Sequence, residues 1–301
     1  MKKGLSVVLA VYNEESNLKD CLDSVANIAS EIVIVDGTST DKTVEIAKEF
    51  DAKIIIRENP PIFHINKQIA LEKASYEWIL QLDADERVGE QLAEEIQKII
   101  VMNNDELKNY QLDLKSRELF LRNQEQWEIK QGKFTKDTGE IVGLFLPRLN
   151  YFLGRYLRYG GVYPDGAIRL VKNGKAFFPA KDVHEIIQLE GEVGWLESPL
   201  YHWDSPTFSR YIQRNSRYIH LIASQLNDEK VDKSIIQFLN YVIYKPIHWF
   251  LLTLIRHKGI LDGWQGIVFS FFSALRFPRA YIEYLGKEYS PTSPRLRGTS
   301  H

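Results

Sequence analysis

Two aspartates separated by one residue follow a short apolar run in the first third of the chain. The run Trp78–Leu82 has the length and character of a buried strand, and Asp83-Ala84-Asp85 comes directly after it. Residues i and i+2 of an extended segment point to the same side, so both carboxylates can face the carboxyl edge of a sheet, where open α/β sheets bind ligands. Two hard oxygen donors there predict a site for Mg²⁺ or Mn²⁺ that bridges the phosphates of a nucleotide. The alternative is an acidic surface loop, in which this spacing occurs by chance.

The elements that must position these aspartates follow an alternating pattern. Strand-like apolar runs are separated by segments with the i, i+3, i+4, i+7 spacing of amphipathic helices; the runs lie at 5–11, 32–35, 53–56 and 78–82, and the helical segments at 18–28, 44–50 and 65–74. This alternation predicts a mostly parallel, Rossmann-like sheet flanked by crossover helices. Ser39 or Thr40 is expected to cap the helix that follows the second strand.

The first strand is not followed by a glycine-rich loop. There is no G-x-G-x-x-G after it and no G-x-x-x-x-G-K-[ST] anywhere, which argues against a dehydrogenase and against a P-loop enzyme. Tyr12-Asn13-Glu14-Glu15 stands there instead. The Tyr12 ring could stack on a base or could be an ordinary half-buried ring. Asp36, at the end of the second strand, could accept a hydrogen bond from a base N–H.

Three segments together resemble the family 2 glycosyltransferases of GT-A fold: Val8–Glu15, Ile32–Asp41 and Trp78–Glu86, in the order and at the spacing of that family. The resemblance implies a nucleotide-sugar donor held by the half-sheet, with Tyr12 and Asp36 on the base, Glu14 on the nucleoside, Asp83 on the ribose or metal, and Asp85 on the metal. The implied donor-binding set is Tyr12, Asn13, Glu14, Asp36, Lys67, Asp83 and Ala84. Lys67 lies where the family often carries a basic residue before Asn, but Gln68 follows it here.

Transfer of a sugar to a hydroxyl needs a carboxylate that takes the acceptor's proton and a cation that stabilises the departing diphosphate. Asp182 and Glu185 are the carboxylates offered by the middle of the chain. The Val183-His184-Glu185 segment resembles the lipopolysaccharide-core glucosyltransferase branch of the family, which implies Glu185, or else Asp182, as general base of an inverting displacement. By the same resemblance His202 would complete the metal shell with Asp85 and Asp83, although a structural role is the alternative. Arg148 and Arg169 are candidate diphosphate or acceptor contacts.

The middle of the chain carries weaker patterns. Tyr110–Leu114 alternates like a strand that Arg117–Arg122 could extend, and the polar segment 124–139 is expected to be a loop. Asn173-Gly174 between apolar runs predicts a hairpin that pairs 168–171 with 176–178.

The last hundred residues are predicted to be helical over 206–289, after a glycosyltransferase domain at 1–205. Two apolar, aromatic-rich segments occur there, Ile235–Ile255 and Trp264–Leu275. The second is too short to span a bilayer, and Lys245-Pro246 interrupts the first. Basic residues at their ends suit helices that lie at a membrane surface, while packing on the domain or in a dimer is the alternative. The Ser/Pro/Arg-rich tail, 290–301, is expected to be disordered.

Composition narrows the function classes. The 301 residues are 44% hydrophobic and 26% charged, as in a globular protein, and the net charge of −2 argues against a general polyanion or nucleic-acid binder. The single cysteine, Cys21, has helical core spacing and fits a reducing compartment. The apolar run after Met1-Lys2-Lys3 is too short for a signal peptide. We therefore expect a cytoplasmic protein, peripheral on the inner face of a membrane.

The sequence thus predicts a metal-dependent, inverting glycosyltransferase that moves a sugar from a UDP-sugar to a hydroxyl of a saccharide or lipid-linked acceptor in cell-envelope glycan synthesis. One alternative is a membrane-associated module that binds a nucleotide-sugar without turnover. Another is a sugar nucleotidyltransferase, which needs a glycine-rich loop after the first strand. The oligomeric state is open, and a homo-oligomer is compatible with the sequence.

Overall fold

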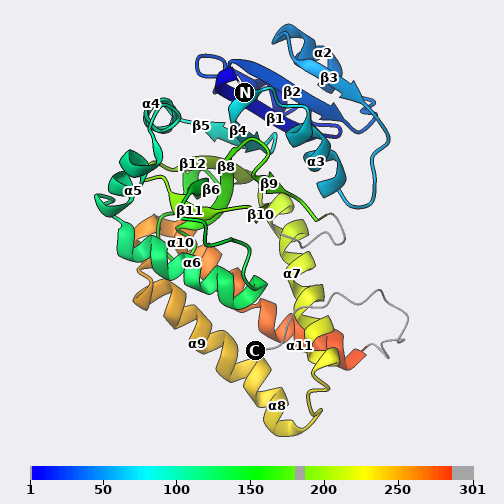
Figure 1. Cartoon of the computed structure of the whole chain (residues 1–301). Helices are drawn as coiled ribbons and strands as arrows, with labels where there is room; N and C mark the ends of the chain where they lie inside the picture. The colour runs from blue at the N-terminus through cyan, green and yellow to red at the C-terminus, as the bar shows by residue number, and fades with distance from the viewer. Residues whose placement is uncertain (1, 180–186, 287–301) are drawn as a thin grey trace. The chain divides into compact units, whose positions relative to one another are not determined.

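The computed structural model describes residues 2–179 and 187–286, and its chain forms two compact units. The first unit comprises 1–148 with 164–202, and the second comprises 149–163 with 203–301. Figure 1 traces the chain through both. The predicted division at residue 205 stays a prediction. The predicted disordered tail and Lys181–Glu185 lie outside the described residues.

The first unit is built on a mixed sheet with the strand order β3-β2-β1-β4-β8-β6-β12-β5, with β11 paired to β6. Pairing is parallel from β3 to β4 and antiparallel where β8 joins β4 and β6 and where β12 joins β5. The strands are β1 (Lys2–Val11), β2 (Glu31–Asp36), β3 (Lys53–Ile56), β4 (Tyr76–Leu82), β5 (Glu86–Val88), β6 (Ile141–Phe152), β8 (Asp165–Lys172), β11 (Glu192–Trp195) and β12 (Leu200–Ser205). The predicted α/β class is therefore confirmed; β1 to β4 pair in parallel, and β11 also pairs in parallel with β6.

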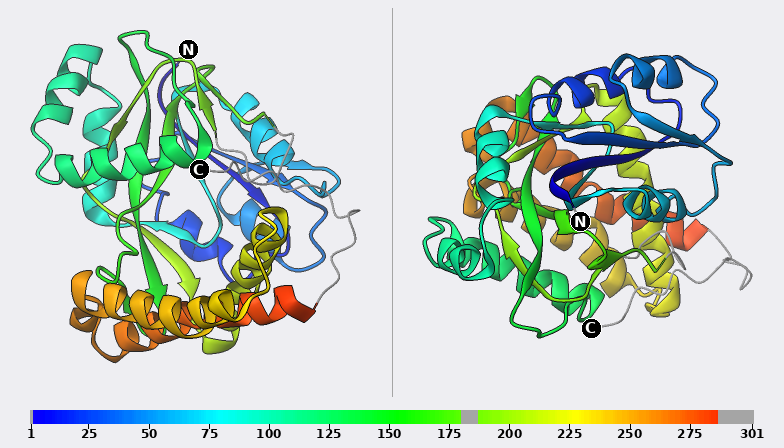
Figure 2. Two further views of the ribbon diagram at one scale, coloured as in Figure 1. Left: turned by 90° about the horizontal axis from the view of Figure 1, so that it is seen from below. Right: turned by 45° about the horizontal axis from the view of Figure 1, so that its top comes forward.

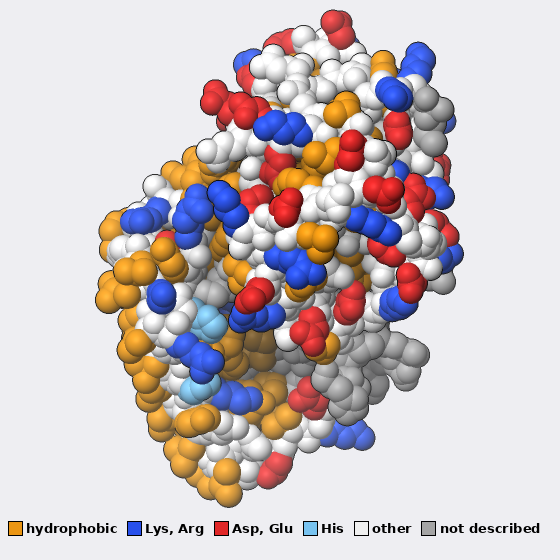
Figure 3. Space-filling model, turned by 60° about the vertical axis from the view of Figure 1, so that its left-hand side comes forward, with side chains coloured by type: hydrophobic (Ala, Val, Ile, Leu, Met, Phe, Trp, Pro, Cys, Tyr) orange, Lys and Arg blue, Asp and Glu red, His pale blue; other side chains and the backbone are white. Residues whose placement is uncertain are grey.

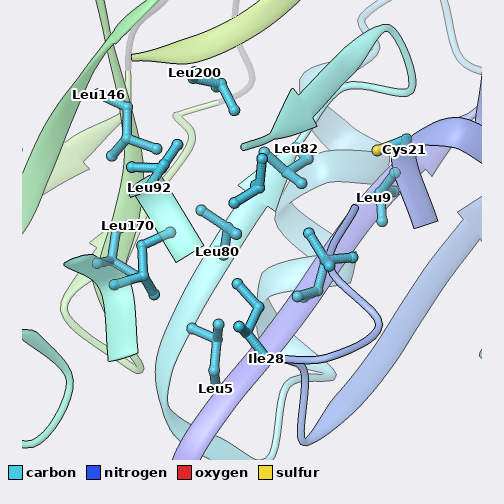
Figure 4. Close-up of a cluster of buried hydrophobic side chains, with 14 of the residues drawn as sticks. Leu5, Leu9, Cys21, Ile28, Leu80, Leu82, Leu92, Leu146, Leu170 and Leu200 are labelled. Carbon is cyan, nitrogen blue, oxygen red and sulfur yellow. The ribbon is translucent and has the colours of Figure 1, made fainter. Parts of the chain in front are cut away.

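The strands β1, β2 and β4 are buried on both faces, which explains why they appear as continuous apolar runs, whereas the edge strand β3 is only partly buried. Alternate residues of β1 point to opposite sides: Leu5, Val7 and Leu9 join one core cluster, whereas Val8 joins another. Figure 4 shows the first cluster, in which Leu9 and Cys21 lie near Leu80 and Leu82 of β4. Cys21 is fully buried there, as its helical spacing predicts.

Helices cover both faces of the sheet, as Figure 1 shows. Buried residues of α1, α2 and α4 belong to the first cluster, and those of α3 belong to the second. The helices of this unit are α1 (Leu18–Asp23), α2 (Thr43–Glu49), α3 (His64–Glu72), α4 (Glu90–Ile99), α5 (Asn104–Leu112) and α6 (Arg117–Gln131). The helices predicted in the first hundred residues are present, with shifted ends.

The strand predicted at Tyr110–Leu114 and its extension to Arg122 are wrong, because these residues lie in or next to α5 and α6. The loop predicted at 124–139 is also wrong in its first part, which continues α6 to Gln131. A capping box begins α5: Asn103 accepts from the Glu106 amide while Glu106 accepts from the Asn103 amide. A short alternation cannot be distinguished from one side of a helix; here α5 buries Leu107, and Leu114 is buried just after the helix ends.

The predicted hairpin is wrong as well, although its turn forms. The Lys175 amide donates to the Lys172 carbonyl, but β8 pairs with β4 and β6, and the short β9 (Ala176–Phe177) pairs with β10 (Gln188–Leu189). Asn173 donates its side-chain amide to the Ala74 and Tyr76 carbonyls. The turn is therefore tied to the start of β4 and does not fold β9 back onto β8.

The second unit is mostly helical. Its strand residues are the ends of β6 and β12 and the short β7 (Arg155–Tyr156), which pairs with β6. Its elements are α7 (Phe208–Asp228), α8 (Ile235–Leu239), the π-helical η1 (Asn240–Tyr244), α9 (Lys245–Leu251), the π-helical η2 (Leu252–Arg256), the 3₁₀ turn η3 (Gly259–Asp262), α10 (Gly263–Ala274) and α11 (Arg276–Gly286). Residues of α7, η1 and α11 share a core that includes Ile219, Tyr241 and Tyr281. The predicted helical character of this region is borne out within its described residues.

Two glycines let η3 and α10 approach each other closely. A Cβ on Gly266 would lie 1.8 Å from the carbonyl oxygen of Gly259, and one on Gly259 would lie 2.8 Å from that of Thr253. The Asp262 carboxylate accepts from the Arg158 and Tyr159 amides at 2.8–3.2 Å. These contacts fix the helical hairpin formed by the segment 235–256 and α10.

Gly266→Ala should therefore lower the free energy of unfolding by about 1–3 kcal/mol, because the new methyl group collides with backbone that cannot rotate away. Urea denaturation would measure the loss. Gly286→Ala is the matched control in α11, where an added Cβ meets nothing within 4 Å. Equal stability of the two variants would contradict the tight approach of η3 to α10.

Candidate active site

The candidate site lies at the carboxyl edge of the parallel strands in the first unit. Val11 pairs with Asp36, and Leu9 pairs with Leu82. The residues that follow these strands, Tyr12 and Asp83, therefore come to the same edge as Asp36. The sheet register brings together the three segments that the sequence singled out.

The loop after β1 is tied to the loop after β2. The Asn13 amide donates to Ser39 Oγ at 2.8 Å, and Asn13 Oδ1 accepts from the Thr40 amide at 2.8 Å. The Glu14 amide donates to Thr43 Oγ1 at 2.8 Å. The prediction that Ser39 or Thr40 caps α2 is wrong, since α2 begins at Thr43 and these two residues bind Asn13 instead. Their hydroxyl and amide groups hold the loop that presents Tyr12, whose side chain is 47% exposed.

Of the two carboxylate oxygens of Asp36, one accepts a hydrogen bond from a described residue of the protein and the other does not. Oδ2 accepts from the Ser39 amide at 2.9 Å. Oδ1 is buried and has no hydrogen-bond partner among the described residues. A buried acceptor without a donor is unfavourable by about 1–3 kcal/mol. Asp36 Oδ1 therefore suits a donor supplied by a ligand, such as the N–H of a base.

Asp83 is held between two buried cations. Its Oδ1 lies 2.5 Å from Lys67 Nζ, and its Oδ2 accepts from Arg169 Nη2 at 2.5 Å. Lys67 comes from α3 and Arg169 from β8, so this carboxylate joins three elements. Burial alone would raise the pKa of Asp83, but Arg169 and then Lys67 hold that pKa well below its usual range. Asp83 is therefore ionised throughout the neutral range.

Arg169 connects Asp83 to a second buried carboxylate. Its Nη2 donates to Glu86 Oε1 at 2.7 Å, and its Nη1 donates to Gln81 Oε1 at 2.5 Å. Arg148 lies 3.5 Å from Glu86 and 2.8 Å from Asp165. The guanidinium groups of both arginines thus contact carboxylates of this network. The sequence analysis assigned no role to Gln81 and Glu86, although a glutamine within the apolar run Trp78–Leu82 was a signal that a buried polar partner exists.

Asp85 faces a different partner. Its Oδ2 lies 3.5 Å from His202 Nε2, and both side chains are largely buried. Antiparallel pairing of β12 with β5 sets His202 opposite Glu86, the residue after Asp85. Asp85 and His202, which were both predicted as metal ligands, are far apart in the sequence but adjacent in the structure.

The Asp85 carboxylate and the His202 imidazole suit a divalent cation that arrives with a diphosphate. Among residues 2–179 and 187–286 no group of three or more His, Cys, Asp and Glu side chains is arranged to hold a metal. Asp83, the third predicted ligand, has both oxygens engaged with Lys67 and Arg169. Mg²⁺ is usually bound by one or two carboxylates together with substrate phosphates, and an imidazole is better tolerated by Mn²⁺. Asp85 and His202 are the described residues that could hold such a cation together with the phosphates.

The other predicted residues have the following positions. Lys67 is buried on α3 against Asp83, and burial lowers its pKa while Asp83 opposes that shift. Ala84 is buried between the two aspartates. Glu14 accepts from the Asn17 side chain at 2.8 Å. Asp182 and Glu185, the candidate bases, lie outside the described residues, so their roles stay predictions.

A model of glycosyl transferase family 2 matches residues 6–158, just over half of the 301 residues. The chain belongs to glycosyltransferase family 2. The mixed sheet flanked by helices is the GT-A fold of this family, and the chain is a glycosyltransferase, as the resemblance implied.

Two relatives illustrate what is shared. The lipopolysaccharide core biosynthesis glycosyltransferase LpsC of Rhizobium meliloti is 27% identical over 288 residues, which cover 91% of this chain and 92% of LpsC. An uncharacterized glycosyltransferase of Rickettsia typhi is 37% identical over 116 residues, or 38% of this chain and 39% of that protein. The chain therefore matches about two-fifths of the length of the Rickettsia relatives.

Solved structures with a partly similar arrangement include TarS 1–349 of Staphylococcus aureus, with 12% identity, a TM-score of 0.38, and coverage of 96% of this chain and 93% of that one. Glucosyl-3-phosphoglycerate synthase of Mycobacterium tuberculosis, crystallised with Mn²⁺, UDP-glucose and phosphoglyceric acid, has 25% identity and a TM-score of 0.26 over 28% of this chain and 34% of its own.

Arg169→Met should lower the free energy of unfolding by about 3–5 kcal/mol, because it leaves Glu86 and Asp83 short of a buried countercharge. Chemical denaturation would measure this loss. Arg122→Met is the matched control, since Arg122 also pairs with a glutamate, Glu118, at 3.5 Å, but with both side chains exposed. It should leave the unfolding midpoint nearly unchanged. Similar effects of the two substitutions would contradict a structural role for the Arg169 network.

Proposed function

We propose that this glycosyltransferase is metal-dependent and inverting, and that it moves a sugar from a UDP-sugar to a hydroxyl of a saccharide or lipid-linked acceptor in cell-envelope glycan synthesis. The observation that carries the proposal is the convergence, at one sheet edge, of the unsatisfied Asp36 oxygen and the Asp85–His202 pair. The first suits a nucleobase, and the second suits the cation on its diphosphate.

Donor binding would use the loops after β1 and β2. Asp36 Oδ1 would accept the base N–H, and the exposed Tyr12 ring would lie against the base. Asn13 and Glu14 belong to the same loop and would border the nucleoside. Lys67, Asp83 and Ala84 would form the floor beneath the ribose and diphosphate, with Lys67 and Arg169 keeping Asp83 in one orientation.

Asp85 and His202 would hold Mg²⁺ or Mn²⁺, which when bound supplies positive charge to the departing diphosphate. The predicted role of Asp83 as a further ligand requires that one of its oxygens leaves Lys67 or Arg169. The side chains of this chain would orient the diphosphate and keep its sugar carbon open to attack from the opposite side.

The acceptor's hydroxyl would lose its proton to Glu185, or else to Asp182, as its oxygen bonds to the anomeric carbon and the bond from that carbon to the UDP oxygen breaks. The proton goes to the carboxylate, and the electron pair of the broken bond leaves with UDP. Attack from the side opposite UDP inverts the anomeric carbon, which is why the reaction is assigned as inverting.

The acceptor class is proposed from the relative LpsC, which matches nearly the whole chain and whose name refers to lipopolysaccharide core biosynthesis. A saccharide on a lipid anchor would be met at the cytoplasmic face of a membrane. We therefore propose that the enzyme works as a peripheral protein there.

Asp85→Ala should remove the effect of Mn²⁺ on UDP affinity and lower sugar transfer by at least about a hundredfold, because a metal at a leaving diphosphate supplies several kcal/mol of charge stabilisation. Isothermal titration with UDP, with and without Mn²⁺, and UDP release from a panel of UDP-sugars would measure the two effects. Asp105→Ala, on α5, is the control. UDP binding without turnover of any donor in the wild type would favour a silent binding module.

Asp36→Ala should weaken UDP binding about tenfold or more, while Mn²⁺ still tightens what remains, since the substitution removes only the base contact. The sharper readout compares UDP with its N3-methyl derivative, which lacks the base N–H. The wild type should discriminate strongly between the two, and the variant should not. Discrimination that survives the substitution would rule out Asp36 as the acceptor of the base N–H.

A further inference from the structure

The segment Ile235–Arg256 presents a continuous apolar stripe that no described residue covers. Every third or fourth residue along one side is exposed and apolar: Ile236, Leu239, Ile243, Ile247, Leu251 and Ile255, with exposed fractions of 73%, 47%, 49%, 56%, 47% and 65%. A helix in a water-exposed position normally carries polar residues on this side. By length and composition this is the one helix among the described residues that could cross a membrane, and 11% of its most apolar window is buried.

A second apolar stripe lies on the neighbouring elements. Ile260, Trp264, Ile267 and Phe271 follow one side of η3 and α10, and each is 42–57% exposed. Because α9 and α10 pack against each other, the two stripes belong to one layer of helices, which the left view of Figure 2 shows as gold and orange ribbons side by side. Figure 3 shows hydrophobic side chains gathered along the lower left margin of the molecule, where this layer is seen from its edge. We call these ten residues the apolar face.

The opposite side of the same segment is docked within the second unit. The Tyr241 ring stacks on Tyr281 with centroids 5.0 Å apart, Trp249 Nε1 donates to Ser273 Oγ at 3.2 Å, and Thr253 is buried. Tyr281 belongs to α11 and Ser273 to α10, so the segment is fixed at both halves of its length. The residues of the apolar face therefore stay exposed although the other side of the segment is packed.

The part of the chain that carries the apolar face has a net positive charge. Between 235 and 286 the chain has five basic residues, Lys245, Arg256, Lys258, Arg276 and Arg279, against two acidic ones, Asp262 and Glu283, a balance of five minus two, or +3. Asp262 is buried against backbone amides, and Glu283 pairs with His220 at 2.6 Å. The whole chain carries −2. Arg256 and Lys258 are exposed at the end of the segment that carries the apolar face. Exposed basic residues beside an apolar surface are complementary to anionic lipid headgroups.

We propose that the apolar face lies in the headgroup layer of an anionic bilayer, with the segment Ile235–Arg256 parallel to the membrane plane. A helix of 22 residues is about 33 Å long and could cross the hydrocarbon core. Crossing would carry Ser273 and Tyr281 into the bilayer or break their contacts with Trp249 and Tyr241. Lying flat keeps every one of these contacts and buries only the side that is already exposed.

The inference rests on the proposed function only in naming the membrane as the place of the acceptor. Vesicle binding is measured without donor, metal or turnover, so its failure and the failure of the glycosyl-transfer proposal are distinguishable. The proposal specifies how a peripheral enzyme would bind the membrane: through the apolar face, with the segment Ile235–Arg256 parallel to the surface, and on anionic lipid.

The first experiment is flotation of the full chain with vesicles of phosphatidylcholine, with and without phosphatidylglycerol. We expect the wild type to float with the anionic vesicles. Ile243→Glu with Ile247→Glu should weaken this binding at least about tenfold, because two side chains lose their apolar burial. Arg256→Gln with Lys258→Gln should weaken it about twentyfold for anionic vesicles only. Val101→Glu with Leu112→Glu, at exposed apolar sites in the first unit, is the matched control and should bind as the wild type does.

The second experiment measures how the segment Ile235–Arg256 is oriented relative to the membrane. Of the three substitutions it needs, only the one at Ile247 changes a residue of the apolar face. Fluorescent labels are attached to Ser234→Cys, Ile247→Cys and Lys258→Cys in separate proteins; the native Cys21 is fully buried, and burial raises its pKa, so it should remain unlabelled. We expect the central label to be quenched by lipids carrying a shallow quencher. Both end labels should be reduced by dithionite added outside the vesicles.

Three results would overturn the proposal. Protection of one end label from dithionite would mean that the segment crosses the bilayer. Equal binding of the wild type to neutral and anionic vesicles, or no binding, would remove the anionic surface as partner. A dimer in sedimentation equilibrium that the double glutamate variant dissociates would show that a second copy of the chain covers the apolar face.

Discussion

The contact of the Asp83 carboxylate with Lys67 and Arg169 is the constraint on which the candidate site depends. The Asp83 carboxylate is partly exposed, but both cations are buried and need its charge, so the contact holds only while all three side chains keep their positions. Lys67, Asp83 and Arg169 come from α3, the end of β4 and β8. The contact therefore fixes a helix and an antiparallel strand against the strand that carries both aspartates, and Arg169 extends the constraint to Glu86.

The two aspartates of the D-x-D motif consequently differ in what they can do. Asp83 directs its oxygens to Lys67 and Arg169, whereas Asp85 faces His202. An extended backbone gives i and i+2 the same side, but β4 ends at Leu82, and the chain turns between the aspartates and β5. Their separate environments follow from that turn. One carboxylate balances charge within the protein, and the other lies close to the His202 imidazole.

The sequence predicted the parallel half of the fold because strands buried on both faces and amphipathic helices leave strong periodic signals, as in Leu5–Val11 and the α3 segment. It failed where periodicity is short: Tyr110–Leu114 alternates over too few residues to exclude a helix, and the pairing of β8 with β4 and β6 depends on contacts remote in sequence. The strand ends were enough to propose Tyr12, Asp36 and Asp85 as candidate site residues, and the sheet register brings their segments to one edge. The partners Gln81, Glu86 and Arg169 could not be proposed in this way, because a buried ion network is decided by tertiary packing.

The late position of strand β12 in the chain affects when the candidate site can form during synthesis. His202 reaches Asp85 only when β12 pairs with β5, and the two residues are separated by more than a hundred positions in the chain. A polypeptide emerging from the ribosome therefore completes the β1–β4 nucleotide-binding core well before its histidine is available. Until that late strand docks, an unfinished protein can hold the loops after β1 and β2 together, but it lacks the imidazole that lies beside Asp85.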